Sequence, residues 1–303
     1  MEIAMINRDH KLWEGGDRRK IENLIAALQK MGVNAFYTCD NEINFKADVY
    51  HLFHMSYETA YKAFLNIKKK KLKLVVSAIY SGDRIPHECQ QEIIDYASKV
   101  IFMSEGELSF VRNNIKVPQN KVSYIKNGVS RIFDTELTKG KYVLCVGRIQ
   151  PMKNQLNLAI ACKNLGFDLK YVGEIIDQGY ASKVLNTWGE WLPNRPQEEL
   201  VELYKEAQVV ACVSEHDIQP NCVLEGGLSG ANIVLTDKSK SFLDGFPNIW
   251  ICKTDPESIR EAVVSAWNAP KNGELKNIFR TWTWEKAATK LIGVYNEVLK
   301  SPI

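Results

Sequence analysis

The sequence predicts an α/β protein made of two doubly wound domains. Short apolar runs typical of buried parallel strands alternate with longer stretches of helical periodicity along most of the 303-residue chain. Apolar periodicity stops between Phe133 and Gly140, and a second series of strand-like runs begins at Lys141. The length is sufficient for two domains that each bury a core.

The first half contains a series of strand-like runs separated by helical stretches. The runs are Ile3–Ile6, Val49–Phe53, Leu72–Ile79, Lys99–Met103 and Lys121–Ile125. A loop with Gly15 and Gly16 follows the first run, and Asp17 can cap the next helix, which Gly32 ends. Two glycines without G-x-G-x-x-G spacing are weak evidence for a ligand site, so a simple tight turn is an equal alternative.

The second half repeats this alternation of strands and helices. Its strand-like runs are Tyr142–Val146, Asp168–Val172, Val209–Val213, Asn232–Leu235 and Ile249–Cys252. We therefore expect an N-terminal domain over residues 1–135 and a second domain over residues 136–280. Open α/β sheets bind ligands at the carboxyl ends of their strands, so functional residues are expected directly after these runs.

The segment SEHDIQPNCVLEGGLSG, residues 214–230, places two acids in a loop that leads from a strand into a helix. Asp217 and Glu225 are separated by seven residues. The free N–H groups and the positive end of such a helix suit a phosphate, and carboxylates accept hydrogen bonds from vicinal hydroxyls. The segment therefore predicts a ligand that carries both phosphate and sugar.

Two cations follow the strand Tyr142–Val146. Gly147 and Arg148 lie at its carboxyl end, and Lys153 lies about one loop later. Charged side chains are usually solvated surface groups, and that alternative applies to each cation taken alone. Together with the acidic segment, however, they favour a site that neutralises a diphosphate.

Four segments, together with the acidic segment, resemble the retaining glycosyltransferases of family 4, also called glycosyl transferases group 1. The segments are KYVLCVGRIQPMKN (141–154), EELVELYKEAQ (198–208), PQNKVSYIKNGV (118–129) and WEKAATK (284–290). The resemblance implies the GT-B architecture, in which two Rossmann-like domains face a cleft. It also implies that residues 281–303 form a helix that crosses back to the N-terminal domain.

The resemblance implies a role for each matched residue. Arg148 and Lys153 would bind the diphosphate of a nucleotide-sugar donor, Glu225 the ribose, and Asp217 the transferred sugar, so that Arg148, Lys153 and Asp217 carry the catalysis. Further donor contacts would come from backbone or side-chain groups of Gly147, Gly173, Trp191, Leu192, Asn221, Cys222 and Val223. Because backbone contacts carry no side-chain signature, the nucleoside of the donor stays open, with uridine as the default. A half-buried aromatic at the domain edge is the alternative for Trp191.

The first acid departs from the family pattern, which usually has two glutamates. Asp217 is one methylene shorter, so its carboxylate reaches ~1.5 Å less far. Glu215 is an alternative source of the acid, although its spacing to Glu225 does not fit, and an exposed loop acid is as good an interpretation. For His216, a surface histidine of the loop is an equally good interpretation. Pro220 and Asn221 match a family variant, which indicates that the loop is intact.

The acceptor side is less defined. Candidates are Gly15, Gly16, His54 and Tyr80, with a satisfied structural histidine as the alternative for His54. The loop after the strand at 72–79 lacks the histidine found in many relatives, which leaves the acceptor-activating group open. The basic run Lys68–Lys73 is usually a solvated helix end, but it also suits anionic lipid headgroups.

Composition excludes several classes of protein. The net charge of +3 is too small to argue for nucleic acid, and the seven cysteines lack paired C-x-x-C spacing, which favours reduced thiols and a cytoplasmic location. No apolar stretch reaches the length of a membrane span. We therefore expect a soluble protein, or one that binds peripherally to the inner face of the membrane. The chain has no D-x-D metal motif, and we expect no metal or other cofactor.

The residues together with the resemblance imply a metal-independent transfer of a sugar from a nucleotide-diphosphate-sugar, by default a UDP-sugar, to an acceptor hydroxyl with retention. The acceptor would be a glycan, a lipid-linked molecule or another hydroxyl compound. Two other classes stay open. A sugar-nucleotide epimerase of the same architecture needs acid and base groups around the sugar that are not identifiable here. A noncatalytic nucleotide-sugar-binding protein is consistent with Asp217 and with the missing histidine.

Overall fold

The computed structural model describes residues 1–7, 16–79, 84–163, 165–239, 243, 245–271 and 273–301. They form two compact units. The first unit comprises Met1–Gly128 with Trp284–Ile303, and the second comprises Val129–Thr283. The first division therefore falls after Gly128 and not after residue 135, because Val129 and Phe133 are buried in the core of the second unit.

The first unit alternates strands and helices as the periodicity predicts. Its elements are β1 (Glu2–Ile6), α1 (Gly16–Lys30), β2 (Asn34–Thr38), β3 (Val49–Phe53), α2 (Glu58–Lys69), β4 (Leu74–Ser77), α3 (His87–Tyr96), β5 (Lys99–Phe102), α4 (Glu105–Arg112), β6 (Val122–Tyr124) and α11 (Trp284–Lys300). Its described strands form a six-stranded sheet in the order β2-β1-β3-β4-β5-β6, and each pair is parallel. The order reverses between β1 and β3, which is where ligands bind in sheets of this kind.

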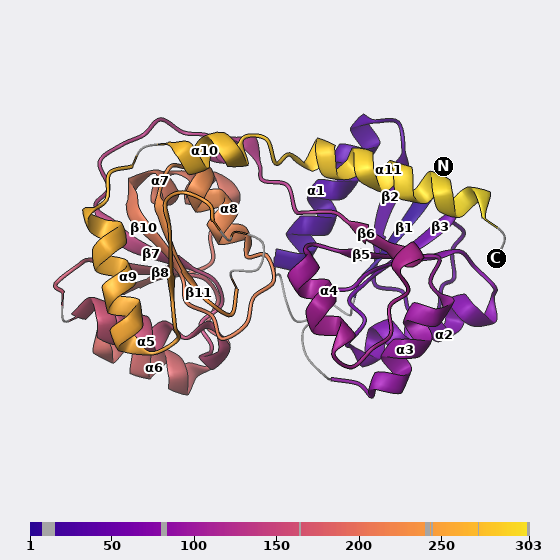
Figure 1. The fold of residues 1–303 in the computed structure, drawn as a ribbon, viewed down its shortest axis with the longest axis horizontal. Helices are drawn as coiled ribbons and strands as arrows, with labels where there is room; N and C mark the ends of the chain where they lie inside the picture. Colours follow the sequence, from indigo (N-terminus) through magenta and orange to yellow (C-terminus); the bar gives the residue numbers. More distant parts are fainter. Residues whose placement is uncertain are drawn as a thin grey trace. The chain divides into compact units, whose positions relative to one another are not determined.

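Helix α11, the last of the chain, packs on α1 of the first unit (Figure 1). Its Tyr295 hydroxyl lies 2.7 Å from Nδ1 of His51, a fully buried residue of β3. Lys73 donates from Nζ to the carbonyls of Val298, Leu299 and Ser301 at the end of α11. A cation at a helix C-terminus satisfies its free carbonyls and complements its dipole, so this lysine holds the helix in place.

Several lysines of the basic run Lys68–Lys73 have partners inside the first unit. Besides Lys73, Lys68 forms an ion pair with Glu92 at 2.6 Å, and Lys70 donates to the carbonyls of Glu42 and Ile43. These contacts give three of the lysines a structural role. Contact with anionic lipid headgroups would therefore rest mainly on Lys69 and Lys71, which are exposed.

The second unit has a second parallel sheet. Its elements are β7 (Tyr142–Val146), α5 (Gln155–Lys163), β8 (Leu169–Val172), α6 (Gln178–Thr187), β9 (Glu190–Leu192), α7 (Gln197–Glu206), β10 (Ala207–Cys212), α8 (Asn221–Leu228), β11 (Asn232–Thr236), β12 (Ile249–Cys252), α9 (Pro256–Asn268) and α10 (Glu274–Phe279). The described strands are ordered β12-β11-β10-β7-β8-β9, all pairs parallel. Counted within the unit this is the order 3-2-1-4-5-6 of a common doubly wound fold, and it reverses between β7 and β10.

Two strands were not predicted, β2 and β9. Both lie on the outer side of their sheet, and β9 has only three residues. Short edge strands bury few side chains, so their sequences, NAFYT and EWL, lack a long apolar run. The remaining strands begin or end within a few residues of the predicted runs.

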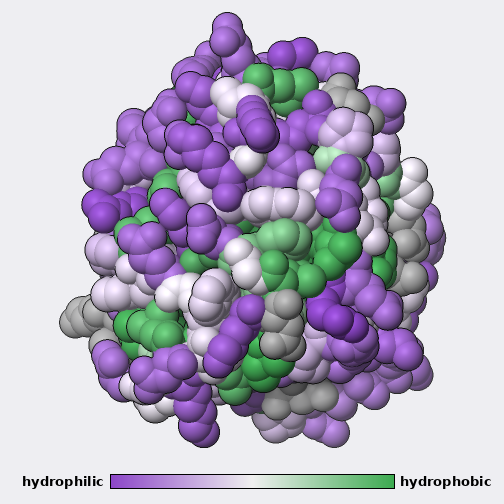
Figure 2. Space-filling model, turned by 90° about the vertical axis from the view of Figure 1, so that its left-hand side faces the viewer, coloured by the Kyte–Doolittle hydropathy of each residue, from purple (hydrophilic) through white to green (hydrophobic). Residues whose placement is uncertain are grey.

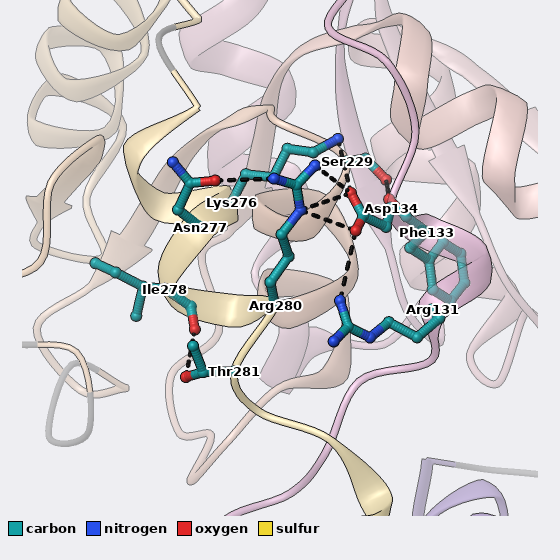
Figure 3. A network of polar contacts seen from close by, with 9 residues as sticks. All are labelled: Arg131, Phe133, Asp134, Ser229, Lys276, Asn277, Ile278, Arg280 and Thr281. Carbon is teal, nitrogen blue, oxygen red and sulfur yellow. Dashed lines mark hydrogen bonds and ion pairs between the residues drawn. The ribbon is translucent and has the colours of Figure 1, made fainter.

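A network of charges ties the start of the second unit to its last helix (Figure 3). Asp134 accepts from Nε and Nη2 of Arg280 and forms an ion pair with Nζ of Lys276 at 3.1 Å, and Arg131 lies 3.5 Å away. Hydrogen bonding from Arg280 holds the pKa of Asp134 below its usual value. Close by, the Val129 N–H donates to the Trp282 carbonyl. The segments by which the chain enters and leaves the unit are therefore joined.

The surface is mainly hydrophilic in the view of Figure 2, with apolar side chains in groups between the polar ones. Exposed large apolar residues of the second unit include Ile132, Leu137, Met152, Ile160 and Ile251. Separate apolar side chains of this kind are normal on folded proteins. Within the described ranges, none of the helices has the length and apolar character needed to span a bilayer.

We predict that Asp134→Asn lowers the stability of the second unit by about 2 kcal/mol, because it leaves the nearly buried Lys276 ammonium without its counter-charge. Urea unfolding followed by tryptophan fluorescence measures this, since five of the seven tryptophans lie in this unit. In the wild type the same contribution should be lost as the pH falls through the lowered pKa of Asp134.

The double variant Asp134→Asn/Lys276→Met should recover most of this loss, because it removes both charges. Glu257→Gln, which removes an exposed ion pair with Arg260, is the control and should change stability by less than about 0.5 kcal/mol. An unfolding midpoint of Asp134→Asn equal to that of the control would show that the network does not hold the unit together.

Candidate donor site in the second unit

The candidate site lies at the carboxyl edge of the second sheet, where the strand order reverses. Gly147 and Arg148 follow β7, and the acidic loop follows β10, the neighbouring strand. The two loops are joined by a hydrogen bond from the Glu215 N–H to the Met152 carbonyl, 2.9 Å long. Parallel pairing of β7 and β10 thus brings the predicted cations and acids to one place.

Lys153 and Asp217 form a short ion pair within this site. Nζ of Lys153 lies 2.5 Å from Oδ2 of Asp217, and the two side chains are 20% and 21% exposed. Burial lowers the pKa of Lys153, but the charge and the hydrogen bond of Asp217 outweigh it, so that the pKa lies above its usual value. Lys153 is therefore an ammonium ion. Its contact with the Asp217 carboxylate sets the direction of its remaining N–H groups.

Two further groups of β10 and its loop hold Asp217. The Ser214 hydroxyl donates to the same Oδ2 at 3.2 Å, and the Cys212 thiol lies 3.9 Å from it. The Ser214 carbonyl in turn accepts from Thr236 at the end of β11. Glu215, the alternative acid, is exposed, and His216 is half-exposed. The structure thus pairs Asp217, and not Glu215, with Lys153.

The backbone of Arg148 is held by a hydrogen bond, whereas its side chain is not held in this way. Its carbonyl accepts from Nε2 of Gln155, a fully buried residue at the start of α5. Within the described parts of the chain, its half-buried guanidinium makes no hydrogen bond or ion pair. Since Asp217 compensates Lys153, Arg148 supplies the excess positive charge of the site.

Asn154 shapes the turn between Lys153 and α5. Its backbone is left-handed, with φ 57°, a conformation that asparagine tolerates better than most residues. Its buried side chain donates to the Thr254 carbonyl, 2.7 Å away. This turn sets the direction from which Lys153 enters the site.

Glu225 lies on the buried side of α8. Its side chain accepts a 2.7 Å hydrogen bond from the Tyr204 hydroxyl of α7, and the residue is 6% exposed. Gly226 and Gly227 follow it, and a Cβ at either would lie within 3 Å of Val210 or Phe279. The glycines therefore let α8 pack tightly on β10 and α10. Asn221, Cys222 and Val223 form its first turn, with Cys222 and Val223 buried.

Gly173, Trp191 and Leu192 also meet at this edge. The Gly173 N–H donates to the Leu192 carbonyl, and the Trp191 indole donates to the Gly173 carbonyl at 2.9 Å. A Cβ on Gly173 would lie 2.3 Å from the carbonyl oxygen of Gly147, so this residue must be glycine. The half-buried indole of Trp191 therefore holds the loop after β8, which is a structural role.

Sequence reasoning missed three residues that support the site: Ser214, Tyr204 and Gln155. Ser214 stands next to the acidic motif, which is a usable signal. Tyr204 and Gln155 lie in helices, and their polar ends reach the site only through tertiary packing. No local pattern identifies such contacts.

The predicted acceptor-side residues lie in the first unit. Gly16 begins α1, and His54 follows β3 as a residue that is 2% exposed. Gly15 and Tyr80 lie outside the described residues. His51 belongs to the core: burial, with a smaller effect of the nearby Lys20 charge, lowers its pKa to about 3. Of the two histidines in this strand region, only His54 lies at the carboxyl edge.

Solved structures similar to this one are glycosyltransferases. A glycosyltransferase from Rickettsia africae matches with a TM-score of 0.75 and 15% identity, over 99% of this chain and all of the other. HepE from Anabaena, solved with UDP-glucose, matches with a TM-score of 0.79 and 13% identity, over 98% of this chain and all of the other. Sucrose-phosphate synthase from Thermosynechococcus elongatus also has a TM-score of 0.79, with 12% identity and 98% of each chain covered.

At these identities the likeness establishes the fold, two parallel-sheet α/β units consistent with the GT-B glycosyltransferases. No protein-family model matches the chain, and neither does any curated protein sequence. Among the described residues no group of three or more histidine, cysteine, aspartate or glutamate side chains is arranged to hold a metal ion.

We predict that Asp217→Asn binds pyrophosphate more tightly than the wild type, by roughly fivefold or about 1 kcal/mol, because it removes a negative charge next to Lys153. Isothermal titration calorimetry measures the affinity. Glu215→Asn, which removes an exposed acid of the same loop, should have a smaller effect. Weaker binding by Asp217→Asn would mean that the ion pair is needed to shape the phosphate site.

Proposed function

We propose that this protein is a retaining glycosyltransferase of the family 4 type, an EC 2.4 enzyme of the hexosyltransferase kind. It moves a sugar from a nucleotide-diphosphate-sugar, with a UDP-sugar as the default donor, to an acceptor hydroxyl. The observation that carries this proposal is the Lys153–Asp217 contact beside Arg148 at the reversal point of the second sheet. A net positive diphosphate site with a carboxylate in it fits a sugar bound through phosphate.

The assignment of the donor follows from the positions of the two acids. Glu225, which accepts from Tyr204, serves the ribose hydroxyls, while Asp217 serves the transferred sugar. Uridine is supported by HepE, a similar structure that was solved with UDP and with UDP-glucose. The base would lie near Gly173 and Leu192, where backbone groups provide its contacts.

Catalysis in this proposal is electrostatic. As the bond between the anomeric carbon and the phosphate oxygen breaks, the electron pair leaves with the diphosphate and the sugar becomes oxocarbenium-like. Arg148, Lys153 and the N–H groups at the start of α8 stabilise the growing negative charge. These groups supply the charge that a divalent ion provides in other transferases, so no metal is required and chelator should leave turnover unchanged.

The acceptor is a glycan, a lipid-linked molecule or another hydroxyl compound, and the reaction takes place in the cytoplasm as a step of glycan biosynthesis. Binding of the acceptor by the first unit would exclude water from the donor and so limit hydrolysis of the donor. Peripheral contact with the inner membrane face would rest on Lys69 and Lys71, since Lys68, Lys70 and Lys73 have partners in the chain.

We predict that Arg148→Ala and Lys153→Ala each lower turnover of the donor by about 10² to 10³-fold, because the two cations act on charge that develops in the transition state. Their double variant should be non-additive, since both serve one leaving group. The assay follows UDP release from UDP-glucose, with a chelator arm for the metal requirement.

Two outcomes would contradict this proposal. Wild-type turnover in both single variants would show that the cations are solvated surface charges. Tight UDP-glucose binding without UDP release, in water and with a broad panel of acceptors, would instead identify a noncatalytic nucleotide-sugar-binding protein. Release of an epimerised sugar nucleotide in the absence of an acceptor would identify an epimerase.

We further predict that Glu225→Gln weakens UDP binding by about 10- to 100-fold, because a carboxylate forms stronger hydrogen bonds with ribose hydroxyls than an amide does. Calorimetric titration with UDP tests this, and the melting temperature shows whether α8 is still folded. Glu198→Gln, an exposed acid of α7, is the matched control and should bind UDP like the wild type. Unchanged affinity in Glu225→Gln would remove the ribose assignment.

A further inference from the structure

The first unit has a polar pair at the point where its own strand order reverses. Asp17 lies in the first turn of α1, the helix that follows β1, and His54 directly follows β3. Since β1 and β3 are parallel neighbours at the reversal, both residues lie at the edge where sheets of this class bind ligands. The sequence indicated only a helix-capping role for Asp17.

His54 contacts an oxygen through each ring nitrogen. Nε2 lies 3.2 Å from Oδ2 of Asp17, and Nδ1 lies 3.2 Å from the Ile79 carbonyl oxygen. Nδ1 donates to the Ile79 carbonyl, and Nε2 is in close contact with the Asp17 carboxylate. The histidine is buried, whereas 28% of the Asp17 side chain is exposed. The ring therefore lies behind the carboxylate, which faces outward.

The backbone that carries this ring is strained. His54 and Ile79, at the ends of the adjacent strands β3 and β4, both have positive φ, 70° and 35°. Such conformations are uncommon outside glycine, are unusual for a β-branched residue, and are energetically costly. They persist where the surroundings hold them, here through the His54 N–H to the Ser77 carbonyl and the ring to Ile79. Strain of this kind is concentrated at binding sites.

A buried lysine also interacts with Asp17. Lys20, one turn further along α1, is 7% exposed, and burial lowers its pKa to about 8 against the favourable charges of Glu107 and Asp17. Asp17 thus has a buried histidine in contact with it and a favourable charge interaction with Lys20. An ionised carboxylate only accepts hydrogen bonds, and it suits the hydroxyls of an uncharged polyol, whereas an anion would be repelled.

We propose that Asp17 is the carboxylate that binds the hydroxyls of a sugar acceptor, and that His54 positions it. The proposal rests on the proposed function, since it assigns the second substrate of the same reaction. It differs from a structural role for Asp17 as an acid in the first turn of a helix, which stabilises the helix dipole but binds nothing.

The test uses p-nitrophenyl β-glucoside as the acceptor probe and measures its binding to the full-length protein by saturation-transfer NMR, without a donor. Asp17→Asn should weaken binding by about tenfold or more, because an amide replaces the charged acceptor. His54→Asn, which tolerates a positive φ, should weaken it less. Asp48→Asn is the matched control: it replaces an exposed aspartate at the opposite end of β3 and should bind within about twofold of the wild type.

Equal binding of the glucoside by Asp17→Asn and Asp48→Asn would overturn the inference. So would a lower melting temperature of Asp17→Asn without any change in affinity, and so would a wild type that fails to bind the glucoside. UDP binding separates this failure from that of the proposed function, because it depends on Glu225 and should be the same in all the first-unit variants. With UDP-glucose present, Asp17→Asn should raise the acceptor KM and increase hydrolysis relative to transfer, with little change in UDP affinity.

Discussion

The constraint on which the rest of the structure depends is the parallel arrangement of both sheets. Every paired strand among the described residues runs in the same direction as its neighbours, so each unit delivers its post-strand loops to a single edge. Residues far apart in the sequence meet there, as Lys153 and Asp217 do across 64 positions. The reversal of strand order then sends the connections of two neighbouring strands to opposite faces and leaves a space above their ends. The polar groups of each unit lie at that point.

The Lys153–Asp217 pair shows how a shorter acid changes this site. Aspartate holds its carboxylate close to β10, where Ser214 and Cys212 contact it, and it reaches Nζ of Lys153 directly. The pair costs desolvation on both sides, and the raised pKa of Lys153 shows that attraction exceeds this cost. An ammonium already paired in this way attracts a phosphate less strongly than a free one. The guanidinium of Arg148 has no such partner in the described parts of the chain, which makes the two cations unequal although the sequence presents them as a pair.

Local sequence was sufficient for the elements that bury long apolar runs, and for the motif residues attached to them. It predicted β3, β7 and β12 with their observed bounds, and it placed the cations and the acids directly after two of the strands. It failed where stabilisation comes from tertiary contacts. The unit boundary was placed too late because Phe133 precedes a polar stretch yet packs against Tyr204 of the second unit. The indole of Trp191 donates to the Gly173 carbonyl, a contact that no local pattern shows. Asp17 was interpreted as a cap because its contact with His54 depends on the pairing of β1 with β3, which no short window contains.

The charges at the two reversal points favour different ligands. In the second unit Asp217 pairs with Lys153 beside Arg148, so the diphosphate position attracts an anion, while Asp217 and Glu225 provide carboxylates for hydroxyls. In the first unit, the Asp17 side chain is 28% exposed, while His54 and Lys20 are buried. An anionic ligand there would meet the carboxylate first, whereas a neutral polyol would find an oriented hydrogen-bond acceptor. The same fold therefore provides one unit suited to a sugar diphosphate and one suited to an uncharged hydroxyl compound, which is the division of substrates that glycosyl transfer requires.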